Sequence, residues 1–132
     1  MKFLNFRLQP GDDVRLKLLE ICRVHSLKAG AVVSAVGSLQ QAAIRYASGK
    51  SGQILQGPFE IVSLSGTLSM HGLHIHMALA DAQGEMVGGH LQEGCLVYTT
   101  LELVILEQSG VEFYREPDSA TGYAELVIRP IP

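Results

Sequence analysis

Four of the chain's five histidines lie in one short stretch, from His71 to His90. His74 and His76 are two residues apart in a segment where apolar residues alternate. If that segment is a β-strand, both imidazoles project from the same face, about 6.6 Å apart along the chain. Neutral imidazoles suit zinc and similar first-row divalent metal ions. The spacing therefore predicts a metal site, provided that a third ligand lies nearby.

The turn in the middle of this stretch decides whether His90 joins the pair. The sequence Ala82-Gln83-Gly84 favours a three-residue loop, with the glycine in the left-handed conformation. Asp81 then pairs with Glu85, and the same register places His76 opposite His90. Opposed side chains on a hairpin have Cβ atoms about 4.5–5.5 Å apart. The loop thus predicts three imidazoles on one face of one hairpin.

Other backbone arrangements would give a different result. A two-residue loop would send His90 to the opposite face, and Gly88-Gly89 could add a bulge that shifts the register. With the three-residue loop, we predict that His74, His76 and His90 ligate Zn²⁺ or another first-row divalent metal ion. His71 precedes the strand and is either a fourth ligand or a bystander. The alternative for all of them is an ordinary surface or partly buried histidine.

Three protein ligands leave one coordination position open for water, a ligand or a neighbouring subunit. A catalytic ion would activate a water molecule or polarise a carbonyl group, with a nearby glutamate as the base. Glu60, Glu93 and Glu102 are candidates for that role or for hydrogen bonds to the histidines, although solvated roles are the simpler interpretation. Nothing resembles a catalytic triad, and the sequence suggests no substrate.

The rest of the chain is predicted to form further strands and one helix, which together position this hairpin. Alternating apolar residues predict a first strand over Lys2–Leu8 and a long strand over Phe59–Met70. In the long strand, Gly66 marks a bulge or a close approach of two backbones. We expect an α+β fold, with a mainly antiparallel sheet of about seven to eight strands and one main amphipathic helix packed on it.

Glycine and polar residues divide the segment that follows the helix. Ala31–Val36 and Gln41–Ala47 are predicted to be two strands, interrupted at Gly37. Ser48–Gly57 is rich in turn-forming residues, so we predict a turn there around a short apolar pair.

The helix has clear signals at its start and at its end. Asp12 or Asp13 can cap it, and both acids suit the positive end of the helix dipole. Gly30 is predicted to close it. Apolar residues recur at helical spacing and define the face that packs on the sheet, namely Val14, Leu18, Ile21 and Cys22, with His25 near the far end.

The composition predicts one domain over residues 1–132 that is not a monomer. Charged residues make up 17% of the chain, against roughly 25% in an average soluble domain. Burial of surface in a homo-oligomer is the simplest cause of that shortage. The net charge is −3, and no basic stripe is visible, which weighs against autonomous binding to duplex DNA.

The cysteines and the N-terminal residues point to a cytoplasmic protein. Cys22 and Cys95 lie in apolar contexts without a C-x-x-C motif, so we expect both to be reduced core residues in a reducing compartment. Arg7 and the early acidic residues argue against a signal peptide, and no apolar run approaches the length of a membrane span. We therefore expect no association with a membrane.

Several segments together resemble the PPC domain family, whose name stands for plant and prokaryote conserved. They are Gly57–Leu68 (GPFEIVSLSGTL), Leu73–His76 (LHIH) and Val87–Gly94 (VGGHLQEG), together with Arg7–Asp12 (RLQPGD) directly before the helix. The resemblance covers nearly the whole chain. The combination of the FEI-x-SLSG and GGH-L-x-EG segments is specific to the family.

The resemblance implies an α+β domain that assembles as a homotrimer. For some prokaryotic members it also implies a divalent metal held by histidines, which by motif match are His74, His76 and His90. In plants the domain accompanies an AT-hook that binds DNA, and a G-R-F-E-I-L segment is tied to partner recruitment. This chain has no Arg-Gly-Arg-Pro core of an AT-hook, and Pro58 stands where the plant segment has arginine.

We therefore expect a homotrimeric, metal-binding PPC protein with a binding or regulatory role. DNA association is an implication of the family and is not supported by the charge of this chain. The alternative is a metal-dependent enzyme that acts on an unknown small substrate by zinc-activated water or Lewis-acid chemistry.

Overall fold

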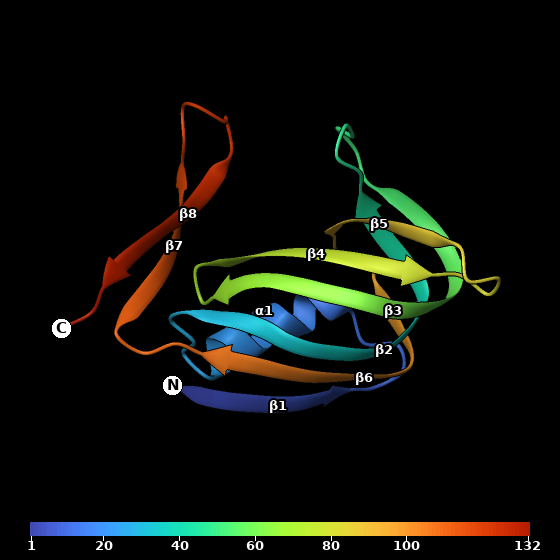
Figure 1. The fold of residues 1–132 in the computed structure, drawn as a ribbon, viewed down its shortest axis with the longest axis horizontal. Coiled ribbons are helices and arrows are strands. Elements are labelled where there is room, and N and C mark those ends of the chain that lie inside the picture. The colour runs from blue at the N-terminus through green and yellow to red at the C-terminus, as the bar shows by residue number, and fades with distance from the viewer.

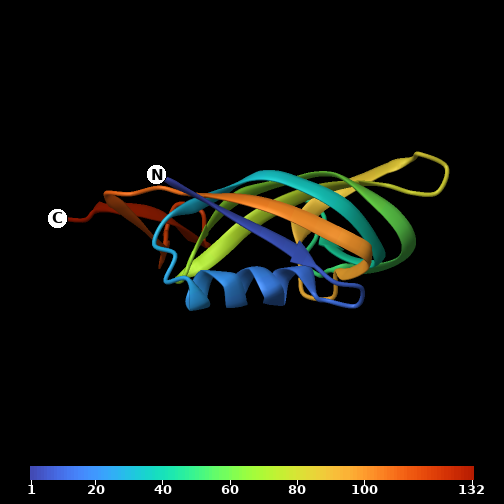
Figure 2. The same cartoon turned by 90° about the horizontal axis from the view of Figure 1, so that it is seen from below.

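Eight strands and one helix make up the chain, and the computed structural model describes all of residues 1–132. In chain order the elements are β1 (Lys2–Leu8), α1 (Val14–Val24), β2 (Gly30–Arg45), β3 (Gln53–Ser69), β4 (Gly72–Ala80), β5 (Met86–Leu91), β6 (Leu96–Glu107), β7 (Val111–Pro117) and β8 (Ala124–Pro130). Six strands form one antiparallel sheet in the order β1-β6-β2-β3-β4-β5, and β7 and β8 form a separate two-stranded sheet. Helix α1 lies along one face of the large sheet, and the β7–β8 hairpin lies at one end of it (Figure 1; Figure 2). The predicted α+β fold, mainly antiparallel with about seven to eight strands and one helix, is confirmed.

Helix α1 begins where the sequence predicts but ends earlier. The side chain of Asp13 accepts a hydrogen bond from the backbone N–H of Leu16 at 3.1 Å and so caps the first turn. The prediction that Gly30 closes the helix is wrong, because the chain leaves it after Val24. Ser26 adopts a left-handed conformation, with φ at +50°.

Two hydrogen bonds complete that helix end. The N–H of Ser26 donates to the carbonyl of Arg23, and the N–H of Leu27 donates to the carbonyl of Cys22. This pattern is a Schellman motif, in which glycine is the usual left-handed residue. A serine occupies that position here, and the side chain of Leu27 is buried against the core. The helix end was missed because its glycine signal is absent.

The segment after α1 is one strand where the sequence predicts two. Strand β2 runs through Gly37 without a break and contains register irregularities on both sides of it. A Cβ atom at Gly37 would lie 2.1 Å from the carbonyl oxygen of Thr100 on β6. The glycine therefore allows two paired strands to approach closely, and it does not end the strand.

The predicted turn at Ser48–Gly57 is shorter than expected. Strand β3 already starts at Gln53, and residues 53–56 pair with β2, from Ile44 opposite Gln53 to Gln41 opposite Gln56. The glycines and serines before Gln53 favoured a turn, and the adjacent apolar pair Ile54-Leu55 does not show the alternation that marks a strand.

One apolar core lies between α1 and the concave side of the sheet. It joins 24 buried residues, including Leu18 of the helix and Leu39, Ile44 and Leu79 of the strands. Both cysteines belong to it and are free thiols, as predicted. Burial raises the pKa of each thiol to about 11, so both are unreactive at neutral pH.

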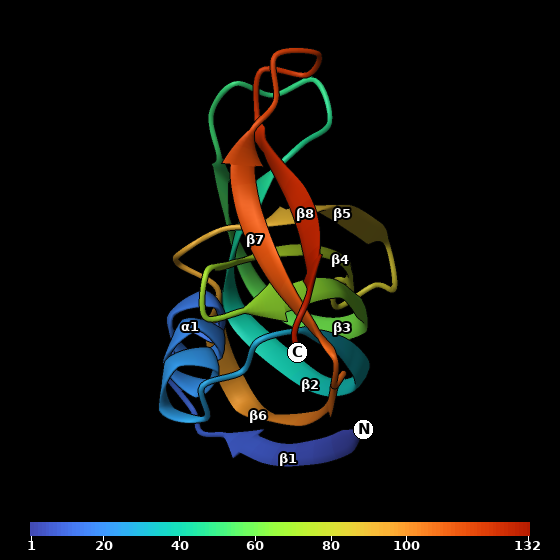
Figure 3. The same cartoon turned by 90° about the vertical axis from the view of Figure 1, so that its left-hand side faces the viewer.

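The sheet curls so that its last strand returns to β2. Ile44 pairs with Leu91 and Arg45 with His90, in addition to the pairing of β5 with β4. The β7–β8 hairpin lies at the opposite end of the sheet, near the start of β2, and stands upright there (Figure 1; Figure 3). A hydrogen bond from the N–H of Phe113 to the carbonyl of Lys28, at 2.9 Å, holds the hairpin there. No helix of the chain is long and apolar enough to cross a membrane.

Candidate metal centre

The β4–β5 turn is the three-residue loop that the sequence predicts. Gly84 is left-handed, with φ at +82°. The N–H of Asp81 donates to the carbonyl of Glu85 at 2.9 Å, and the N–H of Gly84 donates to the carbonyl of Asp81. The carboxylate of Asp81 also accepts the N–H groups of Gln83 and Glu85, each at 2.9 Å. These bonds fix the loop length on which the site depends.

The register of the hairpin runs without a shift from that loop to the histidines. Ala80 pairs with Met86 and His76 pairs with His90, so Gly88-Gly89 adds no bulge. A Cβ atom at Gly89 would lie 2.6 Å from the carbonyl oxygen of Arg45 on β2. This glycine therefore permits the close β2–β5 contact, and the predicted even register is confirmed.

A second glycine sets the position of β4 beside β3. A Cβ atom at Gly66 would lie 2.0 Å from the carbonyl oxygen of His74. The close approach that the sequence predicts at Gly66 is therefore present, and it involves the backbone of a candidate ligand.

Three imidazoles meet on one face of this hairpin. The ring centroids of His74 and His76 are 4.9 Å apart, those of His74 and His90 are 5.0 Å apart, and those of His76 and His90 are 4.4 Å apart. One ring nitrogen from each lies within 4.8 Å of the others. None of the three side chains is buried.

The donor set fits a zinc-like ion. Ligand nitrogens lie about 2.0–2.1 Å from zinc, so two of them in a tetrahedral site are roughly 3.4 Å apart. The three nitrogens lie within 4.8 Å of one another and none of the side chains is buried, so the rings would have to rotate closer together to hold an ion. No fourth histidine, cysteine or carboxylate joins the group, which leaves a position for water or another ligand.

The surroundings favour the neutral form of two of these imidazoles. Partial burial lowers the pKa of His74, and the nearby His76 and Arg115 lower it further. Partial burial also lowers the pKa of His90, with Arg45 and the other two histidines adding to the effect. A metal ion binds the neutral imidazole, so these shifts reduce the competition from protons.

His71 and His25 lie outside this group. The Nε2 atom of His71 is 2.7 Å from the Oε1 atom of Glu112, and its ring stacks on Tyr114 with centroids 4.2 Å apart. His25 packs edge-on against Phe6. Of the two roles left open for His71, the structure supports the bystander.

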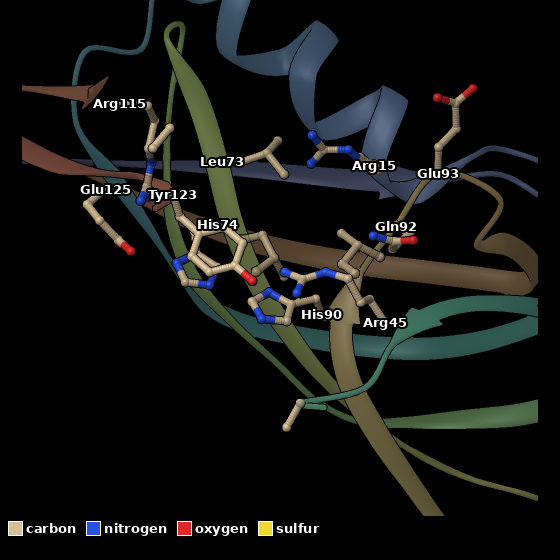
Figure 4. A pocket seen from close by; sticks show the side chains of 14 residues that line it. Arg15, Arg45, Leu73, His74, His90, Gln92, Glu93, Arg115, Tyr123 and Glu125 are labelled. Carbon is tan, nitrogen blue, oxygen red and sulfur yellow. The ribbon is translucent and has the colours of Figure 1, made fainter. Parts of the chain in front are cut away.

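A cleft of about 680 Å³ opens beside His74 and His90. It lies between the β4–β5 hairpin, the first turn of α1 and the β7–β8 hairpin (Figure 4). Three arginines line it, namely Arg15, Arg45 and Arg115. The sequence analysis missed these residues because they come from three separate elements and form no local motif.

The glutamates considered as bases are placed differently from one another. Glu93 lines the cleft and is exposed, and its carboxylate points away from the imidazoles (Figure 4). Glu60 and Glu102 do not line the cleft. None of these three glutamates is therefore directed at the candidate metal position.

Comparison with known proteins gives a family match and close relatives. The family model named Plants and Prokaryotes Conserved (PCC) domain matches residues 1–109, which include β1 to β6. A Bifunctional protein GlmU from Synechococcus is 46% identical over 131 residues, or 99% of this chain, and one from a second Synechococcus strain is 48% identical over 125 residues, or 95%. The chain spans only 21% and 20% of the length of these two curated relatives.

Solved structures share the fold over nearly the whole chain. A hypothetical protein from Salmonella enterica is 41% identical with a TM-score of 0.96, covering 99% of this chain and 95% of its own. A protein from Archaeoglobus fulgidus, described as metal-containing, is 31% identical with a TM-score of 0.85, covering 96% and 94%. A protein from Bacteroides thetaiotaomicron with a provisional DNA-binding name is 16% identical with a TM-score of 0.81, covering 96% and 91%, and shows the fold alone.

Proposed function

We propose that this chain, which belongs to the Plants and Prokaryotes Conserved domain family, is a metal-binding protein with a binding or regulatory role. His74, His76 and His90 hold Zn²⁺ or another first-row divalent ion. The observation that carries the proposal is the convergence of three imidazole nitrogens within 4.8 Å on a hairpin of fixed register. The metal-containing description of the Archaeoglobus relative supports it.

Each part of the hairpin has a defined task in this proposal. The Asp81 carboxylate and the left-handed Gly84 hold the loop length, which keeps His90 on the same face as the other two ligands. Arg45 and Arg115 favour neutral imidazoles through their positive charge. The bound ion would supply a Lewis-acid position open to a fourth ligand.

A metal-dependent enzyme is the second candidate. It is favoured by the open coordination position next to a cleft of small-molecule size. It is disfavoured by the direction of Glu93, because a general base must reach the attacking water. Zinc-dependent turnover that disappears in Glu93→Gln would decide for the enzyme.

The protein is further proposed to be a homotrimer, one domain per chain, in the cytoplasm. The trimer is an implication of the family, and the low share of charged residues supports an interface. Exposed apolar side chains on the sheet support it too. Phe3, Val33, Val36 and Val62 are each 55–59% exposed. DNA is a weak candidate partner because the net charge of −3 opposes binding to phosphates.

Metal analysis of the purified protein tests the proposal. The wild-type protein is expected to carry stoichiometric divalent metal after zinc loading and gel filtration, and His76→Ala is expected to lose it. His25→Ala is the matched control, because it also removes an imidazole but lies outside the group. Equal metal content in His76→Ala and the wild type would overturn the assignment.

A further inference from the structure

The cleft beside the histidines has the size of a small-molecule site. Its volume of about 680 Å³ lies within the usual range of ligand pockets, roughly 300–1,000 Å³. Three structural units meet in it: the first turn of α1, the β2–β5 contact and the β7–β8 hairpin. The candidate metal ligands form only part of one wall, so the rest of the cleft needs its own explanation.

Three guanidinium groups in the cleft form no ion pair. Arg15, Arg45 and Arg115 are each half-buried, and they are half of the chain's six arginines. The ion pairs of the molecule all lie elsewhere, and they are Lys17–Glu20, His71–Glu112 and Arg129–Glu116. Half-burying a cation costs free energy unless an anion or hydrogen bonds compensate it.

The hydrogen bonds inside the protein compensate these cations only in part. Arg115 donates one bond, from Nη2 to the hydroxyl of Thr67 at 2.7 Å. The Cζ atom of Arg45 lies 6.0 Å from the centroid of the Tyr123 ring. No side-chain hydrogen bond involves Arg15 or Arg45, so most of their donors face the cleft or solvent.

The two carboxylates that line the cleft offset the three arginines only in part, and the negative charge of Glu125 acts on Arg115 against the lowering of its pKa by burial. Glu125 accepts a hydrogen bond from the hydroxyl of Thr121 at 2.9 Å and forms no ion pair. Glu93 is exposed and points away from the imidazoles (Figure 4). Three guanidiniums against two carboxylates leave an excess of positive charge, and a divalent ion on the histidines would increase it.

We propose that this cleft binds a small organic anion whose carboxylate or phosphate group is held by Arg15, Arg45 and Arg115. A guanidinium presents a planar fork of donors that matches both oxyanions. Leu73 and Tyr123 line the same cleft and offer apolar surface for the organic part of the ligand. The inference deepens the proposed function and rests on it, because the anion is the ligand that the metal centre would serve.

The β7–β8 hairpin contributes a guanidinium group and an aromatic ring to this ligand site. Residues 1–109, which the family model covers, contain the three histidines, Arg15 and Arg45. Arg115 and Tyr123 belong to or border the hairpin, beyond the matched residues. The hairpin therefore supplies the third arginine of the cleft.

Calorimetric titration with defined probes tests the inference. The zinc-loaded protein and the metal-free protein are titrated with phenyl phosphate and phenylacetate, and with benzyl alcohol as the neutral analogue. At least one anion is expected to bind and benzyl alcohol is not. Arg45→Gln and Arg115→Gln are each expected to weaken binding roughly tenfold or more, as loss of a charged hydrogen bond does. The stronger of the two anions identifies the oxyanion class.

Arg23→Gln is the matched control, because it removes the same charge from an exposed helix position outside the cleft. Thermal unfolding of each variant shows whether it is folded. If Arg115→Gln does not fold, Arg15→Gln replaces it as the test variant. Failure of both anions to bind, or an equal loss in Arg23→Gln, overturns the inference even if metal is bound. Arginine-dependent binding in a protein that holds no metal upholds the inference while the metal assignment fails.

Discussion

A pair of histidines two residues apart on a strand is a common arrangement, and the third imidazole is what turns it into a candidate metal centre. His74 and His76 are neighbours in the sequence, whereas His90 reaches them only through the hairpin register. The surrounding charges then act on the individual rings. Because partial burial, and then the charges of Arg45 and Arg115, lower the pKa of His74 and His90, we expect the stability of the protein to depend on pH.

We expect the metal-free protein to lose stability as the pH falls below about 6.5. The pKa values of His74 and His90 lie below their ordinary value of 6.5 in the folded chain. The unfolded chain therefore binds more protons in the window between the lowered values and 6.5, and the free energy of unfolding falls as the pH is lowered through that window. Urea denaturation in the presence of a chelator, at several pH values from 7.5 to about 5, measures this.

The double variant His74→Gln/His90→Gln is the control for this prediction. It removes both titrating groups, so its stability should fall less steeply over the same window. An unchanged slope would mean that other groups cause the pH dependence.

Among the elements, Gly66 and Gly89 allow the β4–β5 hairpin to lie close to its neighbouring strands. Gly66 lies directly against the backbone of His74, a proposed metal ligand. Gly66→Ala would force its Cβ atom against the carbonyl oxygen of His74, where only 2.0 Å is available. We expect a loss of about 1–3 kcal/mol in stability from this overpacking. Displacement of His74 should also lower zinc affinity by roughly tenfold or more, as disturbed ligand support does. Competition with a fluorescent zinc chelator measures the affinity.

Gly110→Ala is the matched control for Gly66→Ala. Gly110, between β6 and β7, also has a positive φ, but no atom lies within 4 Å of the Cβ position. It should lose stability without losing much zinc affinity. If both variants lose affinity equally, β3 does not position His74.

The helix end gives a prediction in the opposite direction. Ser26 pays the cost of a left-handed conformation at φ +50°, about 1–2 kcal/mol for a residue with a side chain. Glycine removes that cost but adds freedom to the unfolded chain. Ser26→Gly should therefore stabilise the protein by about 0.5–1 kcal/mol net, which differential scanning calorimetry would show as a melting temperature roughly 2–4 °C higher. A lower melting temperature would contradict the assigned helix end.

The β4–β5 hairpin and the end of α1 show which features the sequence could predict. The strands with clear alternation, the helix start at Asp13 and the loop after Asp81 follow from local residue types, so they were predicted. The structural roles of Ser26 and Gly37 depend on distant segments. Ser26 turns the chain so that Leu27 packs into the core, and Gly37 allows the backbone of β6 to approach β2. The arginine-lined cleft depends on tertiary structure in the same way. It could not be predicted, since no sequence spacing brings Arg15 and Arg115 together.

At the scale of the whole molecule, α1 covers only one face of the large sheet (Figure 2). The opposite face exposes Phe3 of β1 and Val36 of β2, each next to a residue that packs into the core. An exposed apolar face of this kind is a candidate contact surface. The proposed trimer would cover it.

Substituting Val36 with lysine should therefore weaken self-association. Val36 is 59% exposed in the single chain, so Val36→Lys costs little in the monomer and much in an interface. Analytical ultracentrifugation is expected to find a trimer for the wild type and smaller species for the variant. Val24→Lys, at a 72% exposed position of α1, is the control and should keep the wild-type mass. A monomeric wild type would contradict the proposal.

The proposed ligands, the hairpin register and the cleft all meet at the candidate metal centre. Anomalous diffraction at the zinc edge, from crystals of the zinc-loaded protein, locates the ion directly. We expect one strong peak per chain, about 2.0–2.1 Å from a ring nitrogen of each of His74, His76 and His90. A peak at any other group of residues, or no peak among these three imidazoles, would contradict it.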